Sequence, residues 1–285
     1  MLLPEKRRPL LKKLINSSGI IRTIEAHNAI SASVVESFNQ SNKNFNAIWI
    51  SSLTETASRG YADNEYLNMP SRMQTLTEVM SQSSLPIIFD ADSGSFNEHL
   101  VRTVHQLENQ GVSAIVLEDK EGFKVNSLTE HNNPQHQIST EAFCQKIKTV
   151  CQTRRSHDFL MVARIETYTL GGETADAIKR AQAYVQAGAD IIMIHSKENT
   201  PDQVKDFAEN YQEKAPLMIV PSTYFKYSED EAQKDGFKII IYANHLLRAA
   251  HKAMINCAEN ILKNGSAEKI HSELSSVKDM LNLVK

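Results

Sequence analysis

Four carboxylic acids occur in two short stretches, Asp90-Ala-Asp92 and Glu118-Asp119, and each stretch directly follows an apolar run. If the fold brings them together, four negative charges in one cleft repel one another unless a cation lies among them. Ligands that are all oxygen select a hard ion, Mg²⁺ or Mn²⁺. Because Mg²⁺ takes only one or two carboxylates directly, some of the four should act through bound water. The alternative is a network of ion pairs without metal, formed with the cations Lys120, Lys124 and Arg164.

Two basic side chains occupy comparable positions later in the chain. Arg164 follows an apolar run and offers a planar fork for a carboxylate or phosphate, with Glu166 beside it to hold the guanidinium. His195 follows another run and is either a structural histidine or a contact and proton donor to an anionic substrate. The other nine histidines are expected on the surface. These residue types predict a metal and an anionic substrate but do not specify the reaction.

The apolar runs have the length and the Val/Ile content of buried β-strands, and segments of helical period separate most of them. Three of these segments, Asn97–Gln110, Thr140–Thr153 and Thr174–Ala187, are clear helices. Alternating βα units imply a parallel sheet, and eight units imply closure into a (β/α)8 TIM barrel, whose catalytic groups follow the strands. An open doubly wound sheet is the alternative, but no glycine-rich dinucleotide motif supports it. The eight runs are Ile20–Ile24, Asn46–Ile50, Pro86–Phe89, Ala114–Leu117, Phe159–Ala163, Ile191–Ile194, Leu217–Val220 and Lys238–Tyr242.

Length and charge narrow the class of protein. A chain of 285 residues fits one barrel domain, 1–285, with extra C-terminal helices at about 245–285, expected as Asn244–Lys263 and Ser266–Val284. A net charge of −3 argues against a nucleic-acid binder, and no run approaches the roughly 20 apolar residues of a membrane span. The N-terminus lacks the apolar core of a secretion signal, so we expect a cytoplasmic protein. The three cysteines, which form neither a metal spacing nor an even disulfide set, are expected as free thiols: Cys144, Cys151 and Cys257.

The stretch from Glu121 to Gln137 differs from the rest of the chain in composition. It is polar, contains Gly122 and Pro134, and has almost no hydrophobic period. It directly follows the fourth apolar run and the acidic pair. A long loop at this place in a barrel is typical of a lid over the site, and the alternative is a disordered insertion.

At this stretch the sequence resembles a known family. Glu118-Asp119-Lys120-Glu-Gly-Phe-Lys-Val-Asn126-Ser127 resembles the E-D-K-x5-N-S signature of phosphoenolpyruvate mutases, in the isocitrate lyase/phosphoenolpyruvate mutase superfamily. Further segments match in order along nearly the whole chain. They are Ile24-Glu-Ala-His-Asn, Trp49-Ile-Ser-Ser-Leu53, Asp90-Ala-Asp92, Ala163-Arg-Ile-Glu166, His195-Ser-Lys, Val220-Pro-Ser-Thr-Tyr and Tyr242-Ala-Asn-His-Leu-Leu-Arg248.

The resemblance implies a Mg²⁺-dependent enzyme, with Mn²⁺ as a possible substitute, that interconverts phosphoenolpyruvate and phosphonopyruvate, with the equilibrium toward phosphoenolpyruvate. It also implies C-terminal helices that swap between subunits of a homodimer or homotetramer. By the same resemblance, Asp90 is the principal metal carboxylate, and Asp92 and Glu118 support it through water. The substrate-binding residues it implies are Trp49, Ser51, Ser52, Leu53, Asn126, Ser127, Arg164 and His195, with Lys124 and Asn126 on a gating loop and Asp63 as a nucleophile or an orienting group.

The subfamily depends on a few positions. The carbon–carbon lyases of the superfamily carry a Lys-[Lys/Arg]-Cys-Gly-His loop, which this chain lacks. Phosphonopyruvate hydrolases usually have Thr where this chain has Asn126, so Asn126 favours a mutase. Departures from the family pattern are a shorter segment Asp90–Asn97, Val125 in place of Thr, and Ser52 in place of a Gly, where a positive φ would be strained. A hydrolase and a barrel that binds a metabolite without chemistry remain the alternative hypotheses.

Overall fold

The computed structural model describes residues 2–39, 43–64, 66–121, 124 and 136–283. By internal contacts the chain divides into two compact units, Met1–Asn244 and His245–Lys285. The first unit contains the strands and the predicted site. None of the helices in the described ranges is both long and apolar enough to cross a membrane.

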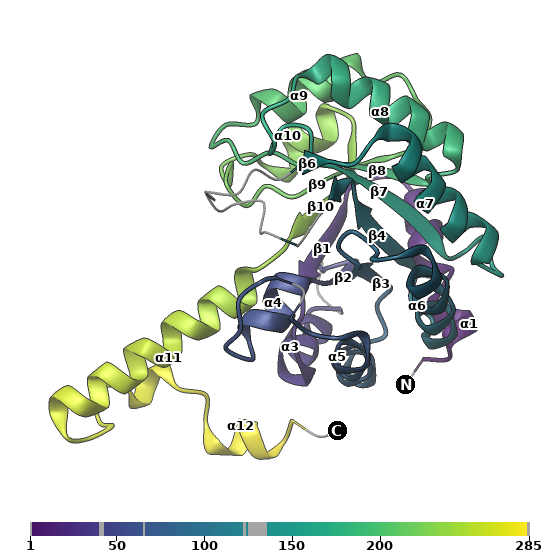
Figure 1. Cartoon of the computed structure of the whole chain (residues 1–285). Helices are drawn as coiled ribbons and strands as arrows, with labels where there is room; N and C mark the ends of the chain where they lie inside the picture. The colour runs from purple at the N-terminus through teal and green to yellow at the C-terminus, as the bar shows by residue number, and fades with distance from the viewer. Residues whose placement is uncertain (1, 40–42, 65, 122–123, 125–135, 284–285) are drawn as a thin grey trace. The chain divides into compact units, whose positions relative to one another are not determined.

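A closed barrel of eight parallel strands forms the centre of the first unit (Figure 1), which confirms the predicted TIM barrel. Every predicted strand is present, with ends that differ by at most two residues from the expected ones. The order around the barrel is β1-β10-β9-β8-β7-β4-β3-β2. The bounds are β1 Ile21–Glu25, β2 Ala47–Ile50, β3 Ile87–Asp90, β4 Ala114–Glu118, β7 Leu160–Ile165, β8 Ile191–Ile194, β9 Leu217–Ile219 and β10 Phe237–Tyr242.

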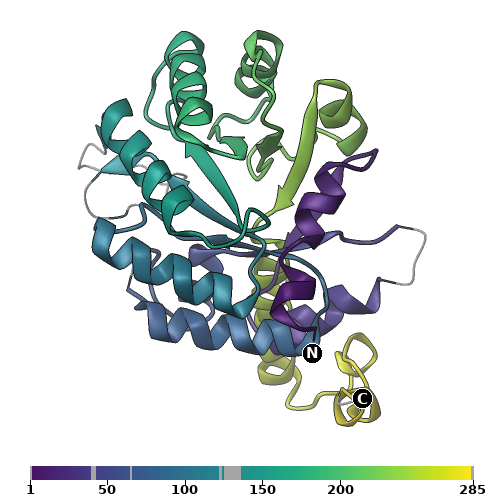
Figure 2. The ribbon, with the colours of Figure 1, turned by 90° about the vertical axis from the view of Figure 1, so that its right-hand side faces the viewer.

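Alternate residues of the strands fill the barrel interior. Pairs two positions apart, such as Ala114 and Val116 on β4 or Ile191 and Met193 on β8, belong to one buried apolar cluster. The strands read as continuous apolar runs because their other face is covered by helices, as Figure 2 shows. Leu11, from the N-terminal helix α2 (Leu10–Ile15), joins the same cluster and is fully buried. The interior is thus a packed core, and the chemistry is confined to the strand ends.

The three predicted long helices have the predicted bounds, as α6 (Asn97–Gln110), α7 (Thr140–Thr153) and α8 (Thr174–Ala187). Both α6 and α8 end at a glycine in the left-handed conformation, with φ of 87° at Gly111 and 111° at Gly188. The other helices of this unit are α1 Pro4–Arg7, α3 Ala29–Ser37, α4 Ser52–Ala57, α5 Met69–Gln82, α9 Asp202–Asn210 and α10 Glu229–Lys234.

The ends of the predicted lid segment pair with each other. Strand β5 (Lys120–Glu121) runs antiparallel to β6 (His136–Gln137), with Lys120 opposite Gln137. This pairing closes the base of the segment, and no alternation of apolar and polar residues predicts it. The structure describes only the two strands and Lys124 in this stretch. The lid itself therefore lies outside the described residues.

The second unit contains one long helix, α11 (His245–Asn264), which matches the expected one within one residue. The predicted helix Ser266–Val284 is wrong: the structure has a 3-10 turn at His271–Glu273 and a short α12 (Val277–Leu281). Ser276 explains the break, since its side chain caps α12 by accepting from the Asp279 amide at 3.0 Å. The helix swap and the oligomeric state stay predictions.

Gly111→Ala should destabilise the barrel more than a conformational penalty alone explains. A left-handed alanine costs about 1–2 kcal/mol, and a Cβ at Gly111 would lie only 2.5 Å from the Pro4 Cα. Gly236→Ala is the matched control, because Gly236 has φ of 94° and no described heavy atom within 4 Å of the added Cβ. Urea unfolding of both variants measures the difference. Equal losses of stability would contradict a clash with α1.

Candidate active site

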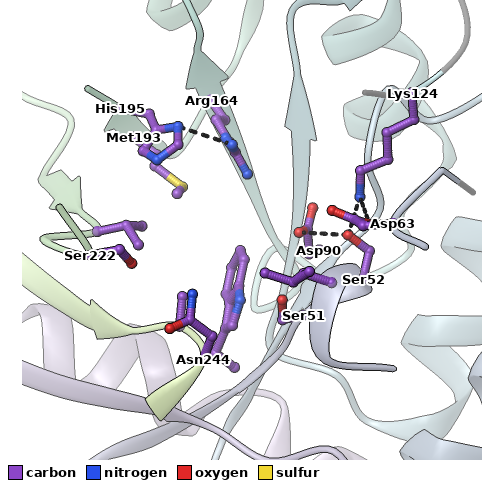
Figure 3. Close-up of a pocket in the computed structure, with 14 residues that line it drawn as sticks. Ser51, Ser52, Asp63, Asp90, Lys124, Arg164, Met193, His195, Ser222 and Asn244 are labelled. Carbon is purple, nitrogen blue, oxygen red and sulfur yellow. Dashed lines mark hydrogen bonds and ion pairs between the residues drawn. The ribbon is translucent and has the colours of Figure 1, made fainter. Parts of the chain in front are cut away.

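One pocket at the carboxyl ends of the strands collects most of the predicted site residues (Figure 3). Two predicted residues lie beside it: Asp92 and Glu118 are buried but do not line this pocket. Asn126 and Ser127 lie outside the described residues. The predicted residues that line the pocket are Trp49, Ser51, Ser52, Leu53, Asp63, Asp90, Lys124, Arg164 and His195.

Lys124 is the centre of one ion-pair network. Its ammonium lies 2.8 Å from Asp63 Oδ1 and also contacts Asp92 Oδ1 and the Ser52 hydroxyl. Asp92 Oδ2 in turn lies 3.3 Å from Arg72 Nη1. Burial alone would lower the pKa of Lys124, but the neighbouring carboxylates outweigh it and raise that pKa above its usual value. Lys124 is therefore a fixed positive charge in the pocket.

Arg164 is the centre of a second network on the opposite side of the pocket (Figure 3). Its guanidinium pairs with Glu166, as the sequence predicts, and its Nη2 lies 3.6 Å from Glu118 Oε2. His195 Nδ1 lies 3.1 Å from Arg164 Nη2 and 3.2 Å from Glu166 Oε1. Burial holds the pKa of His195 below its usual range, so the ring is neutral at physiological pH. Burial also raises the pKa of Glu118 to about 7, although Arg164 and Lys120 oppose that shift.

Asp90 lies between the two networks and belongs to neither. Among the ion pairs of the described residues, none includes Asp90, although only 5% of its surface is exposed. Its carboxylate accepts hydrogen bonds from the Asp92 amide at 3.2 Å and from the Ser52 hydroxyl at 3.3 Å. Burial and the charge of Asp92 raise the pKa of Asp90. A buried carboxylate of this kind is destabilised until a cation reaches it.

The residues present fit a magnesium ion of few direct ligands. In the parts of the chain that the structure describes, no three His, Cys, Asp or Glu side chains come together to ligate a metal. Asp90, however, offers a buried oxygen ligand that takes part in no ion pair among the described residues, and Asp92 and Glu118 pair with Lys124 and Arg164, which line the same pocket. The ion pairs expected without metal are also present, at Lys120, Lys124 and Arg164. These ion pairs supply Asp92 and Glu118 with positive partners, whereas Asp90 takes part in none of the ion pairs among the described residues.

Asp119 is separate from the other three carboxylates of the acidic stretches. It accepts hydrogen bonds from the Glu166 amide at 2.9 Å, from Gln137 Nε2 at 2.7 Å and from the Tyr184 hydroxyl at 2.7 Å. Burial raises its pKa to about 6, and these donors oppose that rise. Asp119 therefore ties the base of the predicted lid to β7 and α8, and it is not a pocket residue.

At the site the structure answers one question that the sequence left open, at Ser52, and corrects one expectation, at His27. Ser52 is the first residue of α4 and has no positive φ, so the serine is not strained; positive φ occurs instead at Asp92 (53°) and Ser95 (55°). His27, expected on the surface, is 7% exposed, and its Nδ1 lies 3.0 Å from Glu25 Oε2. The pair at the end of β1 explains the burial, since the carboxylate satisfies the ring nitrogen.

Comparison with known sequences identifies the family of the chain. The sequence profile described as phosphoenolpyruvate phosphomutase matches residues 11–262. The chain belongs to the phosphoenolpyruvate phosphomutase family. Family membership makes it one of a group of enzymes, and the match spans every strand of the barrel and most of α11.

Relatives within this family differ in the reaction they are named for. The chain is 32% identical to a phosphoenolpyruvate phosphomutase of Tetrahymena pyriformis (96% of this chain, 89% of the relative). It is 34% identical to a phosphonopyruvate hydrolase of Variovorax sp. strain Pal2 (96% and 93%). Among solved structures, a phosphoenolpyruvate phosphomutase from Streptomyces platensis subsp. rosaceus has a TM-score of 0.91 at 32% identity (96% and 93%). A phosphonopyruvate hydrolase solved with oxalate and Mg²⁺ has 0.88 at 31% (99% and 95%).

For this family member, sequence reasoning missed three polar residues of the site. Ser222 and Asn244 line the pocket just after β9 and β10, and neither side chain is titratable. Their position after an apolar run was the available signal. Arg72 contacts Asp92 from helix α5, and nothing in the sequence around it marks it as a site residue.

Proposed function

We propose that this protein interconverts phosphoenolpyruvate and phosphonopyruvate with Mg²⁺. The observation that carries the proposal is the arrangement of one pocket, in which Lys124 and Arg164 face each other across the buried Asp90. Two fixed cations suit the carboxylate and phosphoryl groups of one small anion. Between them lies a carboxylate that takes part in no ion pair among the described residues, which suits a divalent cation, and a related phosphonopyruvate hydrolase was solved with oxalate and Mg²⁺.

The chemistry needs little covalent help from the protein. In the isomerisation the P–O bond breaks, its electron pair stays on the enolate oxygen, and a new P–C bond forms from the enolate carbon. Such a loose phosphoryl transfer requires positioning and charge stabilisation. When bound, Mg²⁺ would be held by Asp90, with Asp92 and Glu118 through water, and would supply positive charge to the substrate oxygens.

The chain's own residues divide this work. Arg164 holds one anionic end of the substrate, and His195, whose Nδ1 lies against both Arg164 and Glu166, contacts the same end. Lys124 holds the other end. Asp63 lies 2.8 Å from the Lys124 ammonium. A carboxylate engaged by an ammonium is a weak nucleophile, so this contact supports an orienting role for Asp63.

Phosphonopyruvate hydrolysis is the second candidate, because a relative of that name is as similar as the mutases are. A hydrolase must admit water to phosphorus, whereas a mutase must exclude it. Asn126 favours the mutase by resemblance and lies outside the described residues. We also expect the protein to be cytoplasmic. We expect a homodimer or homotetramer, and sedimentation of the purified protein tests this oligomeric state.

Phosphorus-31 NMR with phosphonopyruvate and Mg²⁺ should show a growing phosphoenolpyruvate signal. The experiment starts from phosphonopyruvate because the family resemblance places the equilibrium toward phosphoenolpyruvate. Inorganic phosphate together with pyruvate would identify a hydrolase instead. An unchanged spectrum would contradict both reactions and favour a barrel that only binds a metabolite.

A further inference from the structure

Arg72 is a buried cation that reaches the acidic end of β3 from outside the barrel. It lies on α5 and is only 5% exposed. All three guanidinium nitrogens are used: Nε donates to Glu55 Oε2 at 2.7 Å, Nη1 to Asp92 Oδ2 at 3.3 Å, and Nη2 to the Asp90 carbonyl at 2.5 Å. One side chain thus holds the backbone of one metal-site residue and the carboxylate of the other.

The guanidinium is also fixed by packing. Its carbon lies 4.4 Å from the centre of the Phe89 ring, a cation–π contact with the residue that precedes Asp90. Arg72 therefore contacts Phe89, Asp90 and Asp92, which are the last two residues of β3 and the second residue after it. A planar group held by a ring and by three acceptors has little freedom to turn, so it defines where these residues lie.

The segment after β3 that Arg72 contacts contains a strained backbone conformation, which needs contacts from other elements to stabilise it. Asp92 has φ of 53°, a left-handed conformation that costs about 1–2 kcal/mol in a residue with a side chain. Lys146 of α7 donates to the carbonyls of Ser93 at 2.6 Å and Ser95 at 3.0 Å, farther along the same segment. Arg72 also contacts an acidic side chain of the site, that of Asp92.

We propose that Arg72 is a positioning residue for the divalent cation, because it fixes Asp92 and the backbone of Asp90 so that the Asp90 carboxylate stays in the pocket. Lys124 contacts Asp92 at Oδ1 and Arg72 contacts it at Oδ2, so the two cations hold that carboxylate from its two oxygens. The inference rests on the proposed function only for the presence of a divalent cation, not for the reaction.

A purely structural role for Arg72 predicts something different. In that case its pair with Glu55 merely ties α5 to α4, and loss of the pair lowers thermal stability without changing the metal site. Arg59 offers a matched comparison: it is exposed and bridges the same two helices, donating to the Glu55 carbonyl at 2.9 Å and to Thr75 Oγ1 at 2.7 Å. No contact of Arg59 described here reaches Asp90 or Asp92.

The test measures binding of Mn²⁺ to the substrate-free protein by electron paramagnetic resonance of the free ion. Arg72→Met alone would leave the buried Glu55 carboxylate without its positive partner. It is therefore combined with Glu55→Gln, so that neither side chain of the former ion pair carries a charge. Glu55→Gln alone and Arg59→Met are the controls, and Arg72→Lys keeps the charge but not the fork. Thermal unfolding of each variant establishes that it is folded.

We expect Mn²⁺ binding about 10–100-fold weaker in the double variant, the range found when residues that orient metal ligands are changed. Arg72→Lys should lie between the double variant and the wild type, and both controls should bind within about threefold of wild type. Wild-type affinity in a folded double variant would overturn the proposal, as would a wild-type protein that binds no Mn²⁺. A protein that binds Mn²⁺ but converts no phosphonopyruvate would refute the proposed function and leave this inference standing.

Discussion

Arg164→Met should strongly reduce kcat/KM and destabilise the barrel at the same time. The Arg164 guanidinium is the shared partner of Glu118 and Glu166, both of them buried. Removing one member of a buried ion pair costs about 3–5 kcal/mol, because the remaining charges lose their partner. If Arg164 also holds an anionic group of the substrate, kcat/KM should fall about 10³-fold, which corresponds to about 4 kcal/mol. Urea unfolding and the phosphorus-31 assay measure the two effects.

Arg154→Met separates these two effects. Arg154 pairs with Asp190 and donates to the Phe159 carbonyl at 2.8 Å, near the start of β7, whereas Arg164 lies near its end. Its loss should therefore lower stability while kcat/KM stays within about threefold of wild type. Arg164→Lys adds a second control, since it keeps the charge but loses the bidentate fork. A folded Arg164→Met protein with wild-type kcat/KM would refute the substrate-binding role.

The fold was predictable because the barrel is encoded by a repeated local pattern. Each strand is a short apolar run and each long helix has one apolar face. Both patterns can be recognised from the local sequence, without knowing which elements pack against them. The glycines that end α6 and α8 mark the helix ends. The helix expected at Ser266–Val284 was wrong because its hydrophobic period continues across Ser275 and Ser276, where side-chain hydrogen bonds favour a cap over a continuous helix.

From the order of elements alone, the site was predictable only where its residues follow strands, whereas Asp63 and Lys124 were assigned by the family resemblance. Parallel strands place their carboxyl ends together, so Asp90, Arg164 and His195 could be grouped from the order of elements alone. Arg72 could not, because its role depends on how α5 packs against the end of β3. The burial of His27 depends likewise on Glu25, a partner two residues away whose side-chain direction the sequence does not specify.

Asp90→Asn should stabilise the metal-free protein, whereas Asp92→Asn should destabilise it. Burial and the neighbouring charge raise the pKa of Asp90 above its ordinary value of 3.8, so its ionised form opposes folding. Burial also opposes ionisation of Asp92, but Lys124 and Arg72 outweigh it and hold the pKa of Asp92 below that value. We expect a gain of about 0.5–2 kcal/mol from Asp90→Asn. Asp92→Asn should lose about 3–5 kcal/mol, because it leaves two buried cations short of a partner.

The sign of each effect sets its pH dependence, which thermal unfolding in EDTA from pH 2 to 8 measures. Because the pKa of Asp90 is raised, the gain from Asp90→Asn is absent below pH 3.8 and grows as the pH rises through the folded-state pKa. Because the pKa of Asp92 is lowered, the loss from Asp92→Asn is complete above pH 3.8 and shrinks as the pH falls through its folded-state value.

Mg²⁺ and oxalate at 100 times their Kd should add about 2.7 kcal/mol to the wild type and nothing to Asp90→Asn. A stabilised Asp90→Asn protein that still responds to Mg²⁺ would show that the metal binds elsewhere, and a destabilised one would show that Asp90 already has a cation in the metal-free protein.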